Sequence, residues 1–184
     1  MCQKVAKYII IGNAGVGKTS ILKRLKNDTF NENYTITIGV DYYSYNLNNM
    51  KLHIWDTAGL EDYNSINEVF YRNVDCVLYV FDTNNLESFL RIPYWINEVN
   101  KVNNNTIGFL IGNKTDKNNK NSINDNIVIE LCKKYDLIYI KCSAKNGDNI
   151  KNIFDISSTH IEPFLKKTSN KIKIENKKIC CTIM

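Results

Sequence analysis

Residues 12–19 combine three glycines, a lysine and a threonine at a spacing that suits the binding of a polyphosphate. The segment reads Gly12-Asn13-Ala14-Gly15-Val16-Gly17-Lys18-Thr19 and fits the pattern Gly-x-x-x-x-Gly-Lys-Ser/Thr. Glycines let backbone N–H groups approach a phosphate, and the helix expected after them favours an anion at its N-terminus. We expect Lys18 to bridge the β- and γ-phosphates and Thr19, next to Ser20, to offer a hydroxyl to Mg²⁺. The loop predicts a bound nucleoside triphosphate, and its flanking strand and helix disfavour a chance glycine-rich turn.

The base of that nucleotide is indicated by residues 111–116. The segment Ile111-Gly112-Asn113-Lys114-Thr115-Asp116 follows an apolar run, as the phosphate loop does. The carboxylate of Asp116 offers two acceptors, which match the N1 and N2 donors of guanine and find no such donors on adenine. Guanine is therefore the expected base. An ATP-using P-loop kinase, which would bind adenine, is the disfavoured alternative.

From about residue 5 to 165 the sequence resembles the Ras superfamily. Its Asn-Lys-x-Asp motif is matched by Asn113, Lys114 and Asp116, and its Ser-Ala-Lys loop by Ser143, Ala144 and Lys145. The resemblance implies that Asn113 ties the loops together and that Lys114 lies along the base. It also implies that the amide of Ala144 contacts the guanine carbonyl and that Phe30 packs edge-on against the base, with Tyr34 among the nucleotide contacts.

Two further segments resemble the parts of this superfamily that respond to the nucleotide. Residues 55–59 match its Asp-x-x-Gly motif, which implies that Asp56 holds Mg²⁺ through water and that the amide of Gly59 meets the γ-phosphate. Thr37 matches the threonine that closes on Mg²⁺ when GTP is bound, which would order its segment. Residues 38–42, 51–55 and 70–72 resemble the Rab branch more than the Ras, Rho or Arf branches.

The sequence departs from this pattern at Leu60, where the superfamily normally has the glutamine that orients the attacking water. With Lys18 and Thr37, position 60 would complete the hydrolytic residues, but an aliphatic side chain cannot hydrogen-bond water. We therefore expect a GTP-loaded form whose intrinsic and activator-stimulated hydrolysis is strongly reduced. An engineered Gln→Leu change is favoured over natural divergence. A non-catalytic, GTP-dependent membrane recruitment module is the alternative function.

The elements that must position these motifs follow from apolar runs and turn residues. Strand patterns occur at 4–11, 39–47, 51–56, 76–81, 107–111 and 137–140, and helical patterns at 17–26, 86–101 and 150–165. Asn48-Asn49 suits a hairpin, whereas the later strands alternate with helices as parallel strands do. We expect an α/β fold, the P-loop NTPase G domain, with a mostly parallel six-stranded sheet, one antiparallel edge strand and helices on both faces. Pro93 should kink or delay its helix, and Pro163 should stop or bend the last one.

Composition separates a neutral body from a basic tail. The chain has 184 residues, 43% of them apolar, which suits one domain, at 1–165. Residues 166–184 hold six lysines and one glutamate, a net +5 that equals the charge of the whole chain, so the body is neutral. The charge argues against nucleic acid and for an anionic membrane surface as the partner of a flexible tail. The six cysteines show no zinc-site spacing, and we expect a reduced body without disulfides.

The end of the tail carries two overlapping lipidation patterns. Residues 181–184, Cys-Thr-Ile-Met, fit a C-a-a-X box that suggests farnesyl, whereas Cys180-Cys181 resembles the double-cysteine ends of Rab proteins, which are geranylgeranylated. Without a signal peptide or a long apolar run, the expected place is the cytoplasm, peripherally attached to the cytosolic face of an intracellular membrane. The Rab resemblance implies vesicle traffic and a monomer that meets an exchange factor, a GTPase-activating protein, effectors at the switch regions, a prenyl escort and a GDP-dissociation inhibitor.

Overall fold

The computed structural model describes residues 3–31, 37, 39–47, 49–57, 69–117 and 122–180, with side chains as far as residue 165. The strands are β1 (Lys4–Ile11), β2 (Val40–Leu47), β3 (Met50–Thr57), β4 (Cys76–Asp82), β5 (Ile107–Asn113) and β6 (Ile138–Lys141). The helices are α1 (Lys18–Asn27), α3 (Leu86–Leu90), α4 (Ile92–Val102), α5 (Asp125–Tyr135) and α6 (Ile150–Cys180). Each strand and helix pattern expected from the sequence corresponds to elements at those places.

The strands form one six-stranded sheet in the order β2-β3-β1-β4-β5-β6. Only the edge strand β2 is antiparallel: it pairs with β3 in a hairpin whose register runs from Val40 opposite Thr57 to Leu47 opposite Met50. The other neighbouring pairs are parallel. The prediction of a mostly parallel sheet with one antiparallel edge strand is confirmed. Because the strand order turns at β1, the loop after β1 lies where α/β sheets commonly bind ligands.

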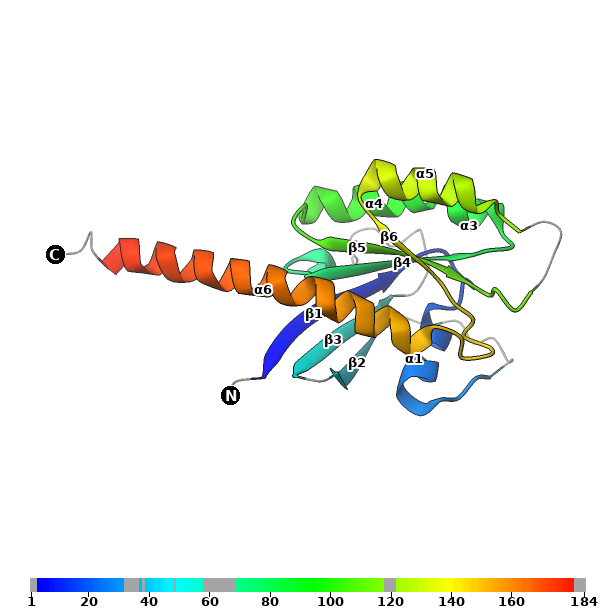
Figure 1. The fold of residues 1–184 in the computed structure, drawn as a ribbon, viewed down its shortest axis with the longest axis horizontal. Helices are drawn as coiled ribbons and strands as arrows, with labels where there is room; N and C mark the ends of the chain where they lie inside the picture. The colour runs from blue at the N-terminus through cyan, green and yellow to red at the C-terminus, as the bar shows by residue number, and fades with distance from the viewer. Residues whose placement is uncertain are drawn as a thin grey trace.

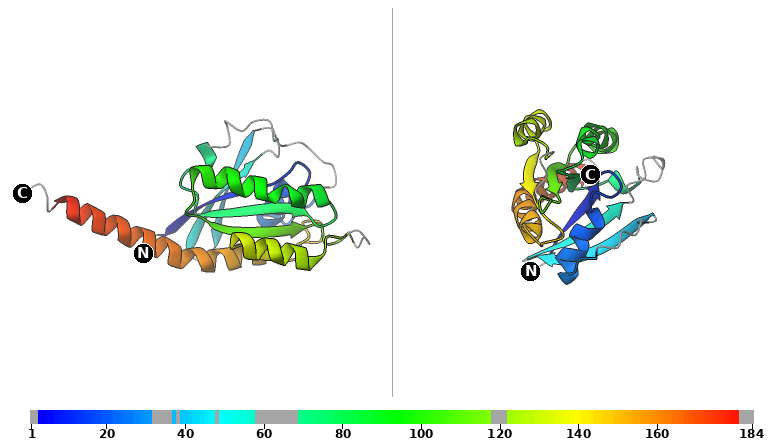
Figure 2. Two further views of the ribbon diagram at one scale, coloured as in Figure 1. Left: turned by 90° about the horizontal axis from the view of Figure 1, so that it is seen from above. Right: turned by 90° about the vertical axis from the view of Figure 1, so that its right-hand side faces the viewer.

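Helices cover both faces of the sheet, as Figures 1 and 2 show. Helices α1 and α6 lie on one face, and α3, α4 and α5 lie on the other. The strands in between are buried on both sides, which explains why β4 is apolar almost throughout and buried at every position. Each face therefore has a separate core.

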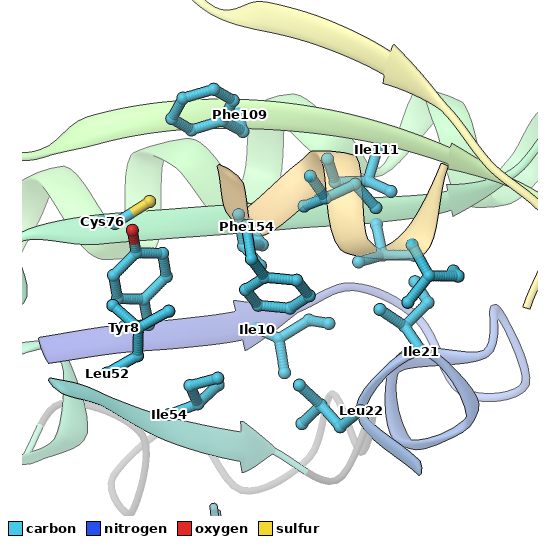
Figure 3. Close-up of a cluster of buried hydrophobic side chains, with 14 of the residues drawn as sticks. Tyr8, Ile10, Ile21, Leu22, Leu52, Ile54, Cys76, Phe109, Ile111 and Phe154 are labelled. Carbon is cyan, nitrogen blue, oxygen red and sulfur yellow. The ribbon is translucent and has the colours of Figure 1, made fainter. Parts of the chain in front are cut away.

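The larger core lies between the sheet and the helices α1 and α6. Figure 3 shows Tyr8 and Ile10 of β1 facing Phe154 of α6, with Ile21 and Leu22 of α1 beside them. All five side chains are at most 1% exposed. The hydroxyl of Tyr8 keeps a partner inside this core, since it pairs with Ser157 Oγ at 3.1 Å. This packing fixes α1, and with it the residues that follow the phosphate loop.

The prolines act differently from each other. Pro93 lies in the first turn of α4, and the helical stretch is interrupted at Arg91, between α3 and α4. This interruption agrees with the prediction that Pro93 kinks its helix or delays its start. Pro163, in contrast, lies inside α6, which continues to Cys180. The last helix therefore does not stop at Pro163, because one proline removes a single N–H bond and a long helix can continue past it. The predicted flexibility of the tail at 166–184 stays a prediction. The predicted domain boundary at residue 165 stays a prediction.

Candidate nucleotide-binding site

The motif residues meet at one edge of the sheet, where the parallel strands β1, β3, β4, β5 and β6 have their carboxyl ends. The phosphate-loop segment 12–17 joins β1 to α1, and Asp56 lies near the end of β3. Asn113 is the last residue of β5, and Ser143 follows β6. Parallel pairing thus brings together residues that are more than a hundred positions apart in the sequence.

The phosphate loop requires glycine at Gly17. This residue has a φ of +98°, in the left-handed region, and a Cβ built on it would lie 2.3 Å from Nδ2 of Asn113. At the tip of the loop, Ala14 and Gly15 are exposed, whereas Val16 and Lys18 are buried. The loop is therefore packed at its base and open at its tip.

Lys18 points its ammonium group back into this loop. Its Nζ donates to the carbonyl oxygens of Gly12 at 2.7 Å and of Asn13 at 3.0 Å. Burial lowers the pKa of Lys18 to about 8, although the nearby Asp56 carboxylate acts in the opposite direction. A buried cation that is held mainly by neutral carbonyls is a suitable partner for a polyanion.

Three oxygen-bearing side chains converge beside Lys18. Thr19 Oγ1 donates to Asp56 Oδ2 at 2.6 Å and lies 2.9 Å from Thr37 Oγ1. Burial raises the pKa of Asp56 to about 6, partly offset by the Thr19 hydrogen bond and by Lys18. The predicted magnesium residues Thr19, Thr37 and Asp56 thus lie together, although Thr19 and Asp56 are 37 positions apart in the sequence.

This oxygen cluster fits a hard divalent cation. Among the described residues, none donates to the buried Oδ1 of Asp56. One oxygen of this carboxylate therefore has no hydrogen-bond partner among them. Hydroxyl and carboxylate oxygens are ligands that Mg²⁺ prefers. Within the described part of the chain, no three His, Cys, Asp or Glu side chains gather into a metal cluster. A cation here would therefore need further oxygens, such as those of a polyphosphate.

Asn113 connects the two halves of the site. Its Nδ2 donates to the carbonyl oxygen of Val16 at 2.8 Å, and its Oδ1 accepts from the backbone N–H of Ala144 at 3.0 Å. The thiol of Cys142 also lies 3.5 Å from Oδ1. Asn113 is 1% exposed, so these bonds are shielded from water. Asn113 thus links the phosphate loop to the loop that follows β6. The N–H of Ala144 already donates to Asn113 Oδ1. The contact of this N–H with guanine stays a prediction.

The predicted base-reading carboxylate is oriented by a neighbouring loop. Ser143 Oγ donates to Asp116 Oδ1 at 2.6 Å and accepts from the backbone N–H of Asn146 at 3.1 Å. Ser143 is fully buried. The hydroxyl therefore fixes one carboxylate oxygen of Asp116 and links residues 113–116 to residues 143–146, as expected for two loops that share one ligand.

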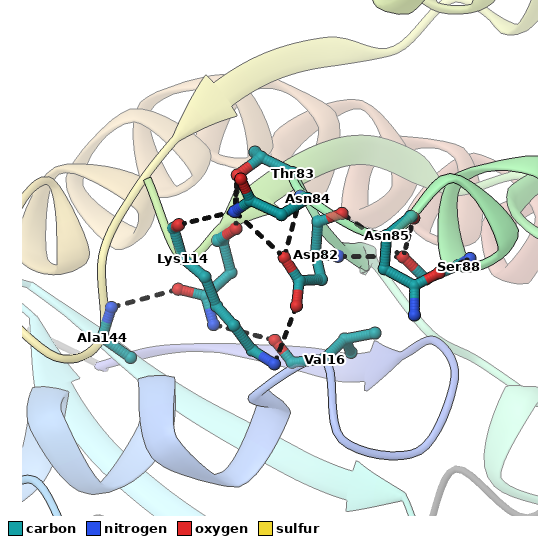
Figure 4. Close-up of polar contacts among 9 residues, drawn as sticks. Val16, Asp82, Thr83, Asn84, Asn85, Ser88, Lys114 and Ala144 are labelled. Carbon is teal, nitrogen blue, oxygen red and sulfur yellow. Dashed lines mark hydrogen bonds and ion pairs between the residues drawn. The ribbon is translucent and has the colours of Figure 1, made fainter. Parts of the chain in front are cut away.

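Asp82, at the end of β4, is a site residue that sequence reasoning missed. Its Oδ2 pairs with Lys114 Nζ at 2.9 Å, and its Oδ1 accepts from the backbone N–H of Asn84 at 2.9 Å (Figure 4). Burial raises the pKa of Asp82, but the Lys114 ion pair and the Asn84 hydrogen bonds outweigh it, so the pKa lies below its ordinary value. An aspartate that ends an apolar run, as Asp56 also does, was the available signal.

Trp95 of α4 was missed as well. Its indole Nε1–H donates to Oδ1 of Asn13 in the phosphate loop at 3.0 Å, and its side chain is 3% exposed. No local pattern indicates this bond, because Trp95 and Asn13 lie 82 residues apart. The phosphate loop is therefore held from the side of α4 as well as by Asn113.

Of the remaining predicted residues, the structure describes some and not others. Phe30 is partly buried and packs against the core beneath α1, so its contact with a base stays a prediction. Tyr34, Gly59, Leu60 and Cys181 lie outside the described residues, and Cys180 is the last residue of α6.

The three cysteines with described side chains, Cys76, Cys132 and Cys142, are buried and unpaired. No helix in the described part of the chain is both long and apolar enough to cross a bilayer.

The fold and the loop between β1 and α1 define a P-loop nucleotide-binding protein. Residues 7–162 match the model of the Ras family. The chain is 37% identical over 162 residues to Ras-related protein Rab-5B of Plasmodium falciparum, which covers 84% of this chain and 77% of that protein. It is 35% identical to Ras-related protein Rab-18-B of Danio rerio (81% and 75% covered) and 35% identical to Ras-related protein Rab-30 of Homo sapiens (80% and 75% covered). The chain belongs to the Ras family and is a Rab-like small GTPase.

Proposed function

We propose that this protein is a Mg²⁺-dependent GTP/GDP switch of intracellular vesicle traffic whose hydrolytic step is impaired by Leu60. The observation that carries the proposal is the convergence of Thr19, Thr37 and Asp56 beside the buried Lys18. When bound, Mg²⁺ supplies charge neutralisation to the phosphates. Lys18 would hold the β- and γ-phosphates, and Thr19, Thr37 and Asp56 would provide oxygens to the cation.

The binding of GTP would be read out through Thr37. Its hydroxyl lies beside Thr19, so a cation bound there would tie the segment around Thr37 to α1. The Gly59 amide would meet the γ-phosphate in the same state, and hydrolysis would release both segments. Asp116, oriented by Ser143, would select guanine, with Lys114 along the base.

Effectors would meet the surface of β2 and β3 next to these segments. Tyr42 is 53% exposed, and its ring packs edge-on against His53 at 5.6 Å and Trp55 at 5.3 Å between centroids. Exposed aromatic groups of this kind are typical anchors of protein interfaces. An exchange factor and a GTPase-activating protein would act on the switch segments themselves.

The tail would place the switch on the cytosolic face of an intracellular membrane. Lipid on Cys180 and Cys181, farnesyl or double geranylgeranyl, together with the tail lysines, gives the paired signal that stable attachment needs. A prenyl escort would present the tail for modification, and a GDP-dissociation inhibitor would remove the protein from the membrane. Mass spectrometry of the native C-terminus identifies the lipid.

Nucleotide identity is tested directly by extracting and identifying the nucleotide from purified protein. We expect GTP or GDP, and titration should show that GTP binds far more tightly than ATP and only with Mg²⁺. Comparable affinities for ATP and GTP would refute the assignment of Asp116 to guanine.

The hydrolytic defect is tested by single-turnover GTP hydrolysis with the Leu60→Gln variant, in the presence and absence of an activating protein. Leu60→Ala is the matched control, because it removes the aliphatic group without adding an amide. We expect glutamine, but not alanine, to raise turnover. If glutamine leaves hydrolysis undetectable even with the activator, the non-catalytic recruitment module, which Leu60 favours, is the better description.

A further inference from the structure

Arg24, in the last turns of α1, binds the loop that follows β6 through two of its three side-chain nitrogens. Its Nε donates to the carbonyl oxygen of Ala144 at 3.0 Å, and its NH2 group donates to the carbonyl oxygen of Lys145. Its NH1 group donates to the backbone oxygen of Asp28 at 2.9 Å and to Oδ1 of the same residue at 3.2 Å. The guanidinium therefore connects the C-terminal end of α1 to residues 144–145.

These contacts use properties that are particular to arginine. The planar fork presents several N–H donors in fixed directions, so it can hold two successive carbonyl oxygens while it also caps its own helix. The Arg24 side chain is only 15% exposed, and Asp28, one turn later, balances its charge and limits its orientation. A lysine at this position could reach one of the carbonyl oxygens, but not the set.

The contact closes a ring of interactions around the site. Ala144 is held at its carbonyl oxygen by Arg24 and at its N–H by Asn113. Asn113 in turn binds the carbonyl oxygen of Val16 in the phosphate loop, which leads directly into α1. From Lys18 to Arg24, α1 spans only about 9 Å at about 1.5 Å per residue. Residues 143–146, which also orient Asp116, are therefore positioned relative to the same helix that carries Lys18.

We propose that Arg24 is a positioning residue for base recognition, which sets the preference for guanine by holding residues 144–145 against α1. The inference rests on the proposed function, since it presumes that residues 143–146 meet the base. Arg24 would not contact the nucleotide. Its loss would let residues 144–145 move, which weakens contacts with guanine and leaves the phosphate contacts of Lys18 and Thr19 in place.

The test compares GDP with ADP, which has the same ribose and phosphates but lacks the guanine donors. Dissociation constants of both nucleotides are measured with Mg²⁺ for the full chain and for Arg24→Met, which keeps an apolar stem and removes every donor. Lys4→Met is the matched control. It also removes one positive charge and one ion pair between elements, the Lys4–Glu162 pair, which joins β1 to α6 away from the site.

We expect Arg24→Met to weaken GDP binding about tenfold, which corresponds to about 1.4 kcal/mol. The affinity for ADP should change less than about twofold, so the preference for GDP falls about tenfold while Lys4→Met preserves it. A role in stability alone would lower both affinities together and leave their ratio unchanged. Arg24→Lys, which keeps the charge, should give a smaller loss of preference and serves if Arg24→Met does not fold.

Two results would overturn the inference in different ways. If the parent chain itself shows no preference for GDP, the base assignment in the proposed function fails and the inference fails with it. If the parent prefers GDP and both Arg24 variants keep that preference, only the inference is wrong.

Discussion

Replacing Gly17 with alanine should damage the site through Asn113 and not only through the backbone. The new Cβ would lie 2.3 Å from Nδ2 of Asn113, far inside van der Waals contact, so the amide must move. Movement would break its bonds to Val16 at 2.8 Å and to Ala144 at 3.0 Å. Both partners would then be left without a bond in a buried setting.

The magnitude follows from these contacts. A left-handed φ of +98° costs an alanine about 1–2 kcal/mol. Leaving buried polar groups without partners adds about 1–3 kcal/mol each. With two such groups, we therefore expect a total loss of about 3–8 kcal/mol, a large share of the roughly 5–15 kcal/mol that stabilises a typical domain. For a protein of this size the melting temperature should fall by roughly 6 °C or more, at about 2–4 °C per kcal/mol.

Gly39→Ala is the matched control, because Gly39 also has a left-handed φ, of +79°, but a Cβ there meets nothing within 4 Å among the described residues. It should cost only the backbone term, about 1–2 kcal/mol. Urea unfolding of the nucleotide-free proteins measures both variants. Equal losses of unfolding free energy in Gly17→Ala and Gly39→Ala would refute the reasoning, since the displacement of Asn113 would then have no cost.

Three further results are expected. Asp82→Asn should lower the free energy of unfolding by about 1–3 kcal/mol at pH 7. Because the pKa of Asp82 is lowered on folding, this stabilisation is present above its ordinary value of 3.8 and is lost as the pH falls through the folded value. The unfolding free energies of parent and variant in urea should therefore converge as the pH falls below 3.8, and a constant difference would contradict the role of the Lys114 ion pair. Trp95→Phe should release Asn13 and speed GDP dissociation several-fold in a fluorescent-nucleotide chase, since a buried acceptor loses its donor; an unchanged rate would show that the bond does not hold the phosphate loop. Burial raises the pKa of Cys142 to about 12, so at pH 8 a thiol reagent should label it only after unfolding, as peptide mapping would show.

Much of this site could be predicted because its motifs stand at strand ends. An apolar run followed by a polar motif marks the carboxyl end of a buried strand, and parallel strands end at one edge. Lys18, Asp56 and Asn113 each lie at or just beyond the carboxyl end of such a strand, so their motifs share one edge of the sheet. The 2.6 Å bond between Ser143 and Asp116 follows from the same geometry, although the residues are 27 positions apart.

The supporting contacts could not be predicted in the same way. Arg24 lies on an amphipathic helix, where an arginine ordinarily faces water, and nothing in the local sequence indicates that its fork meets residues 144–145. The presence of Trp95 at its position is explained by its packing in the core alone, without the hydrogen bond to Asn13. Such bonds depend on how far each helix is rotated and shifted against the sheet, which packing across the whole domain decides.

The phosphate end and the base end of the site differ in whether their polar and charged groups already have partners within the protein. Toward the phosphates, burial disfavours the charges of Lys18 and Asp56, and the carboxylate keeps one oxygen directed at no described partner. A polyphosphate with its cation would place a negative charge at the ammonium and a positive charge at the carboxylate, so it would relieve both costs. Toward the base, Asn113 and Ser143 already have their bonds within the protein. Affinity should therefore come mainly from the phosphate end, whereas the base end, held in place from β5 and α1, contributes selectivity.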